Sequence, residues 1–283
     1  MSIRTISNET YFMTIYDDPF NLRLRVDEVR GDIKKALTFA EKIVFEKQYE
    51  KMIVYIKMEQ IDHSFEFGLQ MEGMIDHFFL GSHAYIMTKY YKNDRKISKY
   101  WTKEDEIIQE VRKKERAVPM KLGNDYDLRK ANINDATELA QLFRDVFEIY
   151  PTPMHERDYI VEQMNQGTIF AVVTFRDKIV SCASAEINQS YKNAEITDCL
   201  TVPSMRKLGL LKHIIAFLEN ELRKNQIFCS YSLARALSFG MNASLHQLGY
   251  QYRGRLVNNC FIFDKLENMN IWVKPLYTAE NLA

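Results

Sequence analysis

The spacing of apolar and polar residues is clearest in residues 194–218, near the middle of the second half of the chain. Its first part is an apolar run that ends at Pro203, which predicts a strand. Its second part repeats apolar residues at helical spacing. Arg206, Lys207 and Gly209 stand in the short segment between them. The pattern therefore predicts a strand, a basic loop containing a glycine, and an amphipathic helix.

The same criteria extend the alternation of strands and helices over the rest of the second half. Alternating or continuous apolar runs predict strands, and apolar residues three or four apart predict helices. The predicted strands are 126–131, 168–175, 179–187, 194–202, 227–234, 250–264 and 269–274, and the predicted helices are 134–147, 156–165, 210–224 and 238–248.

The first half has a weaker but similar pattern. We expect residues 1–20 to be irregular, and residues 92–121 to form a charged surface helix anchored by Trp101, Ile107 and Ile108. A linker is predicted near residues 119–124. The other predicted elements are strands at 21–26 and 52–56, helices at 33–46 and 59–67, and two strands within 68–91 joined around Leu80-Gly81-Ser82.

The composition is that of a soluble globular protein, with 46% hydrophobic and 27% charged residues. Lys plus Arg and Asp plus Glu both number 38, so no net charge attracts the chain to nucleic acid or to an anionic membrane. We therefore expect small-molecule or protein partners. No apolar run is long enough for a membrane span and the start of the chain lacks a signal-peptide core, which predicts a cytoplasmic protein.

The cysteines and histidines give no sign of a metal site or a disulfide. Cys182, Cys199, Cys229 and Cys260 lie in apolar runs without Cys-x-x-Cys spacing, which predicts reduced, buried thiols. Among the six histidines only His77 and His83 are close in sequence, and no third ligand accompanies them. We expect no metal.

The loop before the long helix suits an anion, because backbone N–H groups and the positive end of the helix dipole point outward there. A strand-loop-helix turn that binds nothing is the alternative. The segment Arg206-x-x-Gly209-x-Leu211 resembles the acetyl-CoA signature Arg/Gln-x-x-Gly-x-Gly/Ala of the GCN5-related N-acetyltransferases (GNAT). The order of predicted elements over residues 126–276 also resembles that family. Leu211 departs from the signature: either the helix starts further from the pyrophosphate, or Leu211 turns into the core.

The resemblance implies an α/β GNAT fold with a mixed central sheet flanked by helices, and acetyl-CoA as co-substrate. In that family the end of the strand holds the pantetheine arm and polarises the thioester, and the loop holds the pyrophosphate. The cofactor-binding residues implied are Leu200, Thr201, Val202, Arg206, Lys207, Leu208, Gly209, Leu210 and Leu211, with Asn242 as a further candidate. An asparagine on a helix surface is the alternative for Asn242. The tyrosine that many members use as general acid corresponds to Leu245 here, so the proton donor is unassigned.

Transfer to an amine needs a base, since an alkyl ammonium has a pKa of about 10.4. Glu195 occupies the strand position that resembles the glutamate base of several acetyltransferases, and burial there would raise its pKa. A glutamate facing solvent at a strand start is the alternative. Asp198 is the second catalytic candidate. Because the two are three residues apart, we expect them on opposite faces of a regular strand.

Further motifs resemble the β-lysine N6-acetyltransferases, which make the compatible solute N6-acetyl-β-lysine. They lie around Arg235, Asn242, Asn258-Asn259 and Glu267. For substrate binding we expect Arg235 to pair with the carboxylate, Asn258 and Asn259 to give amide contacts, and Glu267 to meet the 3-ammonium. A structural ion pair, a strand bulge and a surface charge are the respective alternatives. The resemblance also implies lysine 2,3-aminomutase as a pathway partner.

Residues 68–75 and 249–256 share two glycines and a glutamine at matching positions. Stereotyped turn chemistry is one explanation. We interpret the match as a partial copy of one fold, which divides the chain into an N-terminal, degenerate GNAT-like domain at 1–122 and a catalytic domain at 123–283. The first lacks an Arg-x-x-Gly loop, so we expect it to bind no coenzyme A and to cover the substrate side or mediate homodimerisation. Acetylation of another amine or of a protein lysine, and a non-catalytic acetyl-CoA sensor, are the competing hypotheses.

Overall fold

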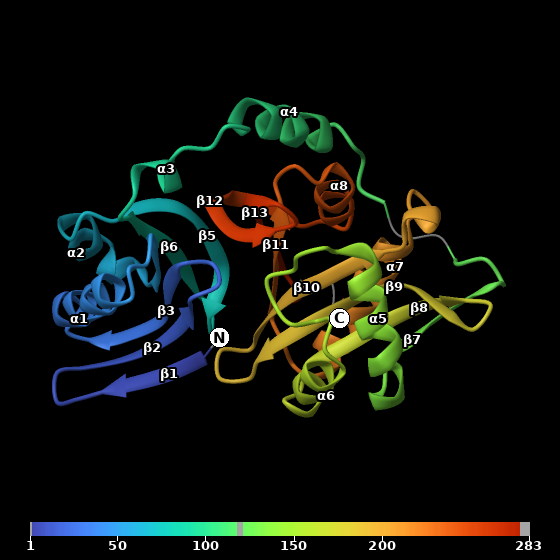
Figure 1. The fold of residues 1–283 in the computed structure, drawn as a ribbon, viewed down its shortest axis with the longest axis horizontal. Helices are drawn as coiled ribbons and strands as arrows, with labels where there is room; N and C mark the ends of the chain where they lie inside the picture. Colours follow the sequence, from blue (N-terminus) through green and yellow to red (C-terminus); the bar gives the residue numbers. More distant parts are fainter. Residues whose placement is uncertain (1, 118–120, 278–283) are drawn as a thin grey trace.

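The computed structural model describes residues 2–117 and 121–277, and the thirteen strands within them form one mixed sheet. Its order is β1-β2-β3-β4-β6-β5-β12-β13-β11-β10-β9-β8-β7. Only β3 with β4 and β10 with β11 are parallel neighbours; the other neighbouring strands are antiparallel. Helices cover both faces, so the predicted α/β fold with a mixed central sheet is confirmed (Figure 1).

The N-terminal half, residues 2–117, contributes six strands. Its elements are β1 (Ser2–Ser7), β2 (Tyr11–Asp18), β3 (Arg23–Gly31), α1 (Ile33–Glu46), β4 (Lys51–Ile56), a 3-10 turn η1 (Met58–Gln60), α2 (Ile61–Glu66), β5 (Gln70–Phe79), β6 (Ser82–Tyr90), α3 (Asn93–Lys96) and α4 (Trp101–Arg112).

The C-terminal half, residues 121–277, contributes the other seven strands. Its elements are β7 (Tyr126–Lys130), η2 (Ile133–Asp135), α5 (Ala136–Val146), α6 (Arg157–Asn165), β8 (Ile169–Phe175), β9 (Lys178–Asn188), β10 (Asn193–Thr201), η3 (Pro203–Met205), α7 (Leu210–Lys224), β11 (Cys229–Arg235), α8 (Phe239–Gln247), β12 (Gln251–Ile262) and β13 (Lys265–Pro275).

These elements confirm most of the predicted boundaries within one to three residues and correct two. The first 20 residues are not irregular: β1 and β2 form a hairpin, and β2 alternates buried and half-buried residues as a strand with one covered face does. The charged stretch after β6 is not one helix but two, α3 and α4, and Trp101 remains 46% exposed. Pro119 and Met120, at the start of the predicted linker, lie outside the described residues.

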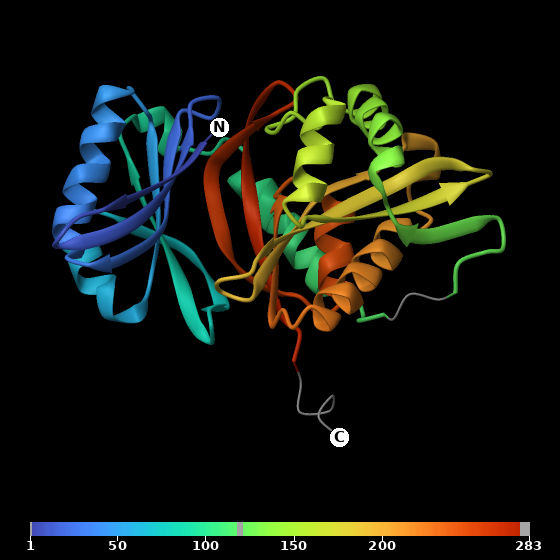
Figure 2. The same cartoon turned by 90° about the horizontal axis from the view of Figure 1, so that it is seen from below.

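Each half has its own apolar core. In the N-terminal half α1 packs on β2, β3 and β4, while in the C-terminal half α7 covers one face of β8–β10 and α5 with α6 covers the other. A further apolar cluster joins the halves; it contains Ile53 and Tyr55 from β4, Phe78 from β5 and Tyr231 from β11. Figure 2 shows the two halves side by side, with β12 and β13 between them.

The strand order of one half repeats in the other. Strands β1-β2-β3-β4-β6-β5 and β8-β9-β10-β11-β13-β12 have the same sequence of neighbours, with the parallel pair at the same place. The repeats meet where Gly73 of β5 pairs with Gly254 of β12. A Cβ on Gly254 would lie 2.3 Å from the carbonyl oxygen of Glu72 and 2.5 Å from the Gly73 Cα. Only glycine lets the two backbones approach this closely.

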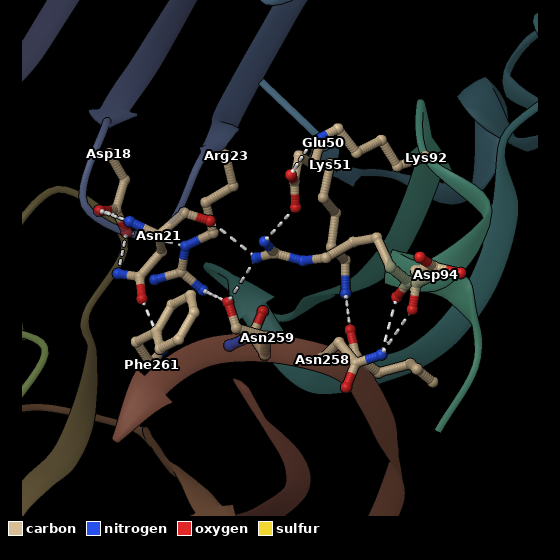
Figure 3. Close-up of polar contacts among 12 residues, drawn as sticks. Asp18, Asn21, Arg23, Glu50, Lys51, Lys92, Asp94, Asn258, Asn259 and Phe261 are labelled. Carbon is tan, nitrogen blue, oxygen red and sulfur yellow. Dashed lines mark hydrogen bonds and ion pairs between the residues drawn. The ribbon is translucent and has the colours of Figure 1, made fainter. Parts of the chain in front are cut away.

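A polar network clamps β12 to the N-terminal half at a bulge between Leu256 and Cys260 (Figure 3). The Arg23 guanidinium donates to the Asn259 carbonyl (3.0 Å) and binds the Asp18 carboxylate (2.8 Å). Lys51, whose side chain is fully buried, donates to the Val257 carbonyl (2.8 Å). These contacts fix the position of the N-terminal half against the C-terminal half.

Candidate active site

A cleft of about 2020 Å³ is lined by residues of both halves. It opens where β10 and β11 separate. Residues Asn193–Glu195 of β10 pair with Cys229–Tyr231 of β11, and beyond these residues the two strands diverge. The basic loop before α7 forms one end, and the facing wall includes Tyr16, Arg25 and Tyr55 of the N-terminal half. We call this cavity the cleft.

Three carboxylates gather in the cleft: Glu186 on β9, and Glu195 and Asp198 on β10. Glu195 pairs directly with Glu186 across the two antiparallel strands, so both side chains are on one face. Ser184 is two residues before Glu186 and shares that face. Its hydroxyl donates to the Asp198 carboxylate at 2.6 Å, which places Asp198 there as well.

The expectation that Glu195 and Asp198 face opposite sides is therefore wrong. It assumed a regular strand, whereas β10 has a bulge between Thr197 and Leu200 in which Asp198 adopts a φ of 51°. The extra residue in the bulge reverses the alternation of side chains. The sequence does not signal this bulge. A glycine would have indicated one, but the residues between Thr197 and Leu200 are Asp198 and Cys199.

Burial raises the pKa of all three carboxyl groups, and repulsion by the Asp198 charge adds to the effect at Glu186 and Glu195. For Glu195, burial followed by the Asp198 charge outweighs the opposing charge of Arg25 and raises the pKa to about 7. Asp198 is held by two donors, the Ser184 hydroxyl and the Tyr150 hydroxyl at 3.2 Å. The pKa of Glu195 suits a base near neutral pH, and that of Glu186, raised to about 8, lies close to it.

The floor between the carboxylates and the N-terminal wall is aromatic. Tyr55 packs edge-on against Phe78 with ring centroids 5.4 Å apart, and Phe78 lies 5.7 Å from Tyr231. Tyr231 is the register partner of Glu195. An apolar chain can lie on this floor with polar groups at both of its ends.

The loop before α7 has the geometry of an anion-binding helix start. Lys207 and Gly209 have positive φ angles of 70° and 75°, and α7 begins at Leu210, so its first N–H groups have no partner within the helix. The Arg206 Nε donates to the Thr201 carbonyl at 3.2 Å. Arg206, Lys207 and Leu208 are exposed. Leu211 is half-buried: it packs on the core and also lines the cleft, so it follows the second of the two explanations only in part.

The other residues predicted to bind the coenzyme are divided between the cleft and the core. Leu200 and Thr201 line the cleft, whereas Val202 packs on the core and donates its N–H to Val180. Asn242 is fully buried and does not line the cleft. Its amide donates to the carbonyls of Arg235 (2.9 Å) and Ser238 (2.7 Å), and its oxygen accepts from the side chains of Asn270 and Trp272. Asn242 therefore joins α8 to β11 and β13.

The structure also separates the predicted substrate residues. Arg235 lines the cleft and pairs with Glu267 at 2.8 Å, but the Glu267 side chain is only 1% exposed. Asn259 lines the cleft and its buried Oδ1 has no hydrogen-bond partner among the described residues. Asn258 is outside the cleft, because its amide donates to three carbonyls at the end of α3, including those of Arg95 and Ile97. It belongs to the clamp between the halves.

Sequence reasoning expected the N-terminal half to cover the substrate side or mediate dimerisation, but named none of its residues as part of the site. Arg25 pairs in register with Tyr16 as Glu195 pairs with Glu186, so the repeat has an arginine and a tyrosine where the C-terminal half has two carboxylates. The equivalent helix start, that of α1, is capped by Asp32, whose carboxylate accepts from the Lys35 N–H at 3.1 Å. An acidic cap occupies the place that an anion would take.

Within the described residues no group of three or more His, Cys, Asp or Glu side chains is arranged to hold a metal, and no helix has the length and hydropathy of a membrane span. Cys182, Cys229 and Cys260 are buried as predicted, whereas Cys199 is half-buried, and all four are free thiols in the structure.

The strand order, the separated parallel pair and the basic helix start define the acetyltransferase class of α/β proteins. The model of the Acetyltransferase (GNAT) family matches residues 136–250. The N-acetyltransferase YodP of Bacillus subtilis is 40% identical over 278 residues, covering 97% of this chain and all of that protein. A Beta-lysine N(6)-acetyltransferase of Methanosarcina mazei is 38% identical over 273 residues, covering 89% of this chain and 98% of that protein.

Among solved structures, the ribosomal-protein-S18-alanine N-acetyltransferase from Escherichia coli aligns with 54% of this chain and 96% of its own, with a TM-score of 0.47 and 16% identity. From the family model and the full-length relatives, the chain belongs to the GNAT acetyltransferase family and is an N-acetyltransferase.

Proposed function

We propose that the protein transfers the acetyl group of acetyl-CoA to the 6-amino group of β-lysine. The observation that carries this substrate is the 38% identity, over nearly the full length of both chains, to the relative that bears that activity in its name. The cleft supports it chemically, because it combines carboxylates that suit an ammonium with arginines that suit a carboxylate.

In this proposal Glu195 is the general base. It takes a proton from the 6-ammonium, and the freed amine attacks the carbonyl carbon of the thioester, so that a C–N bond forms while the C–S bond breaks. Asp198 is held by Ser184 and Tyr150 and keeps the pKa of Glu195 raised. Coenzyme A leaves as a thiolate and takes up a proton, whose donor is unassigned because Leu245 is buried in the core.

The start of α7 fits the pyrophosphate of the coenzyme. Positive φ at Lys207 and Gly209 directs successive backbone N–H groups outward, and a Cβ on Gly209 would meet only the Lys212 side chain, at 3.5 Å. Arg206 and Lys207 supply charge. Leu200 and Thr201, at the end of β10, line the path of the pantetheine arm.

The proposal assigns catalysis to residues 123–283 and gives residues 1–122 the second wall of the substrate site. The support is the position of Tyr16, Arg25 and Tyr55 in the cleft. The N-terminal half takes no coenzyme in this account, because Asp32 caps its helix start and the Gln60 amide donates to the Val29 carbonyl beside the separating strands β3 and β4.

The test is a comparison of amines. Purified protein with acetyl-CoA is given β-lysine, α-lysine, 1,5-diaminopentane and spermidine, and thiol release and product mass are recorded. The proposal expects the highest kcat/KM for β-lysine, with nuclear magnetic resonance locating the acetyl group on N6. Faster turnover of a polyamine would favour the competing view that the acidic cleft serves other small amines. The role of the product as a compatible solute, and its supply by lysine 2,3-aminomutase, depend on that result.

A further inference from the structure

Arg25 and Asp27 form an ion pair on the wall of the cleft that the N-terminal half supplies. The Arg25 Nε and Nη2 donate to the two carboxylate oxygens of Asp27 at 2.5 and 3.1 Å. This leaves Nη1 with no hydrogen-bond acceptor among the described residues. The guanidinium lies over the Tyr16 ring, 4.6 Å from its centroid, which fixes its plane.

Both members of this pair are accessible from the cleft. The side chains of Arg25 and Asp27 are each 25% exposed, and both line the cavity. Two other arginines that line the cleft are paired with buried carboxylates: Arg235 is 29% exposed but Glu267 only 1%, and Arg23 is 11% exposed but Asp18 0%. A zwitterionic ligand needs an accessible cation and an accessible anion side by side. Among these arginine pairs of the described residues, only Arg25–Asp27 offers both.

The pair lies beside the aromatic floor that leads toward Glu195. Arg25 lies 5.9 Å from the Tyr55 centroid, where the aromatic floor that leads to Tyr231 and Glu195 begins. Arg25 is also near enough to lower the pKa of the Glu195 carboxyl. The six bonds from the carboxyl carbon of β-lysine to its 6-nitrogen span about 7 Å when extended. An extended β-lysine therefore reaches about this far along the floor from its carboxylate.

We propose that the Arg25–Asp27 pair is the subsite for the amino-acid head of the substrate, with Arg25 Nη1 binding the carboxylate and Asp27 binding the neighbouring ammonium. This inference rests on the proposed function. It makes the N-terminal half a specificity element of the enzyme, since a diamine without a carboxylate gains nothing from Arg25. It also moves the carboxylate contact from Arg235, the residue that the sequence motifs favour, to a strand of the other half.

The experiment compares three amines that share the reacting end. β-Lysine has the carboxylate and the 3-ammonium, 6-aminohexanoate has only the carboxylate, and 1,5-diaminopentane has a second ammonium but no carboxylate. The full chain and its variants Arg25→Met, Arg25→Lys and Asp27→Asn are assayed on the high-pH plateau, where the Glu195 pKa does not affect the rate. Arg4→Met is the matched control, because Arg4 pairs with Asp17 at 3.2 Å, is 48% exposed and does not line the cleft.

Arg25→Met should lower kcat/KM for β-lysine and 6-aminohexanoate by about 10- to 100-fold, the effect of a lost charge-assisted hydrogen bond, and change that for 1,5-diaminopentane less than about threefold. Arg25→Lys should recover part of the loss. Asp27→Asn should lower kcat/KM about tenfold for β-lysine and leave 6-aminohexanoate unchanged. Unaltered binding of coenzyme A by calorimetry shows that each variant is folded.

Equal losses on all three amines would overturn the inference, because Arg25 would then act through the fold or through Glu195. The same conclusion would follow if Arg4→Met matched Arg25→Met. A wild-type protein that acetylates none of the carboxylated amines refutes the proposed function itself. Wild-type turnover of β-lysine with selectivity unchanged in Arg25→Met refutes only the subsite.

Discussion

Replacement of Glu195 by glutamine removes the proposed base while keeping the shape of the side chain. At pH 7 only about 1 in 2,500 molecules of an amine with a pKa of 10.4 is unprotonated, so without a base the enzyme depends on that small fraction. Loss of a positioned base typically costs 10²- to 10⁴-fold, or about 3 to 5 kcal/mol of transition-state stabilisation. We expect kcat/KM of Glu195→Gln to fall within that range.

The pH profile separates this role from others. Since the pKa of Glu195 is raised to about 7, wild-type kcat/KM should rise with pH through neutrality and then level off. In Glu195→Gln this limb should be replaced by a steady rise of about tenfold per pH unit, because the substrate amine alone then titrates. Asp198→Asn should move the wild-type limb to lower pH, because the Asp198 charge raises the pKa of Glu195.

Stability gives a second readout of the same group. The Glu195 pKa is raised from 4.5 to about 7 by folding, so the folded state keeps a proton that the unfolded state loses in this range, and stability falls as pH rises across it. Glu195→Gln should reduce the fall in Tm between pH 5 and pH 8. Glu162→Gln, which changes a cleft carboxylate hydrogen-bonded to Gln166 on the same helix, is the control. If kcat/KM of Glu195→Gln at pH 7 is within threefold of wild type, and its rise with pH below neutrality is unchanged, Glu195 is not the general base.

Three further predictions concern the junction and the helix start. Gly254→Ala should lower Tm by about 4 °C or more, because φ at this position is +138° and the new Cβ would lie 2.3 Å from the Glu72 carbonyl oxygen. Gly240→Ala is the control. A Cβ there has no atom within 4 Å, so its Tm should be nearly unchanged in the same thermal melt. Lys51→Met should destabilise the protein by about 3 to 5 kcal/mol in denaturant titrations, because it leaves the Glu72 carboxylate buried without its cation. The double variant Lys51→Met with Glu72→Leu should recover part of this loss. A double variant less stable than Lys51→Met alone would contradict the argument. Arg206→Ala should raise KM for acetyl-CoA several-fold, more at low salt, with kcat nearly unchanged, and the reverse pattern would remove the loop from coenzyme binding.

The local patterns of the chain determined most of its secondary structure. Apolar periodicity gave α1 and α7 with their limits, because a helix that covers a sheet needs a continuous apolar face. Residues 206–209 marked the helix start by composition alone, since positive φ and exposed charge at that place require glycine and basic residues. The match of residues 68–75 with 249–256 likewise pointed to strands β5 and β12, which pair at Gly73 and Gly254.

Tertiary structure alone decided which residues share the cleft. The bulge that brings Asp198 beside Glu195 arises from the pairing of β10 with β9, which no local pattern encodes. Asn258 belongs to the clamp between the halves, because a bulge in β12 directs its amide at the end of α3. Arg25 reaches the cleft only because the two repeats join edge to edge. Contacts of this kind depend on residues far apart in sequence, so strand periodicity carries no record of them.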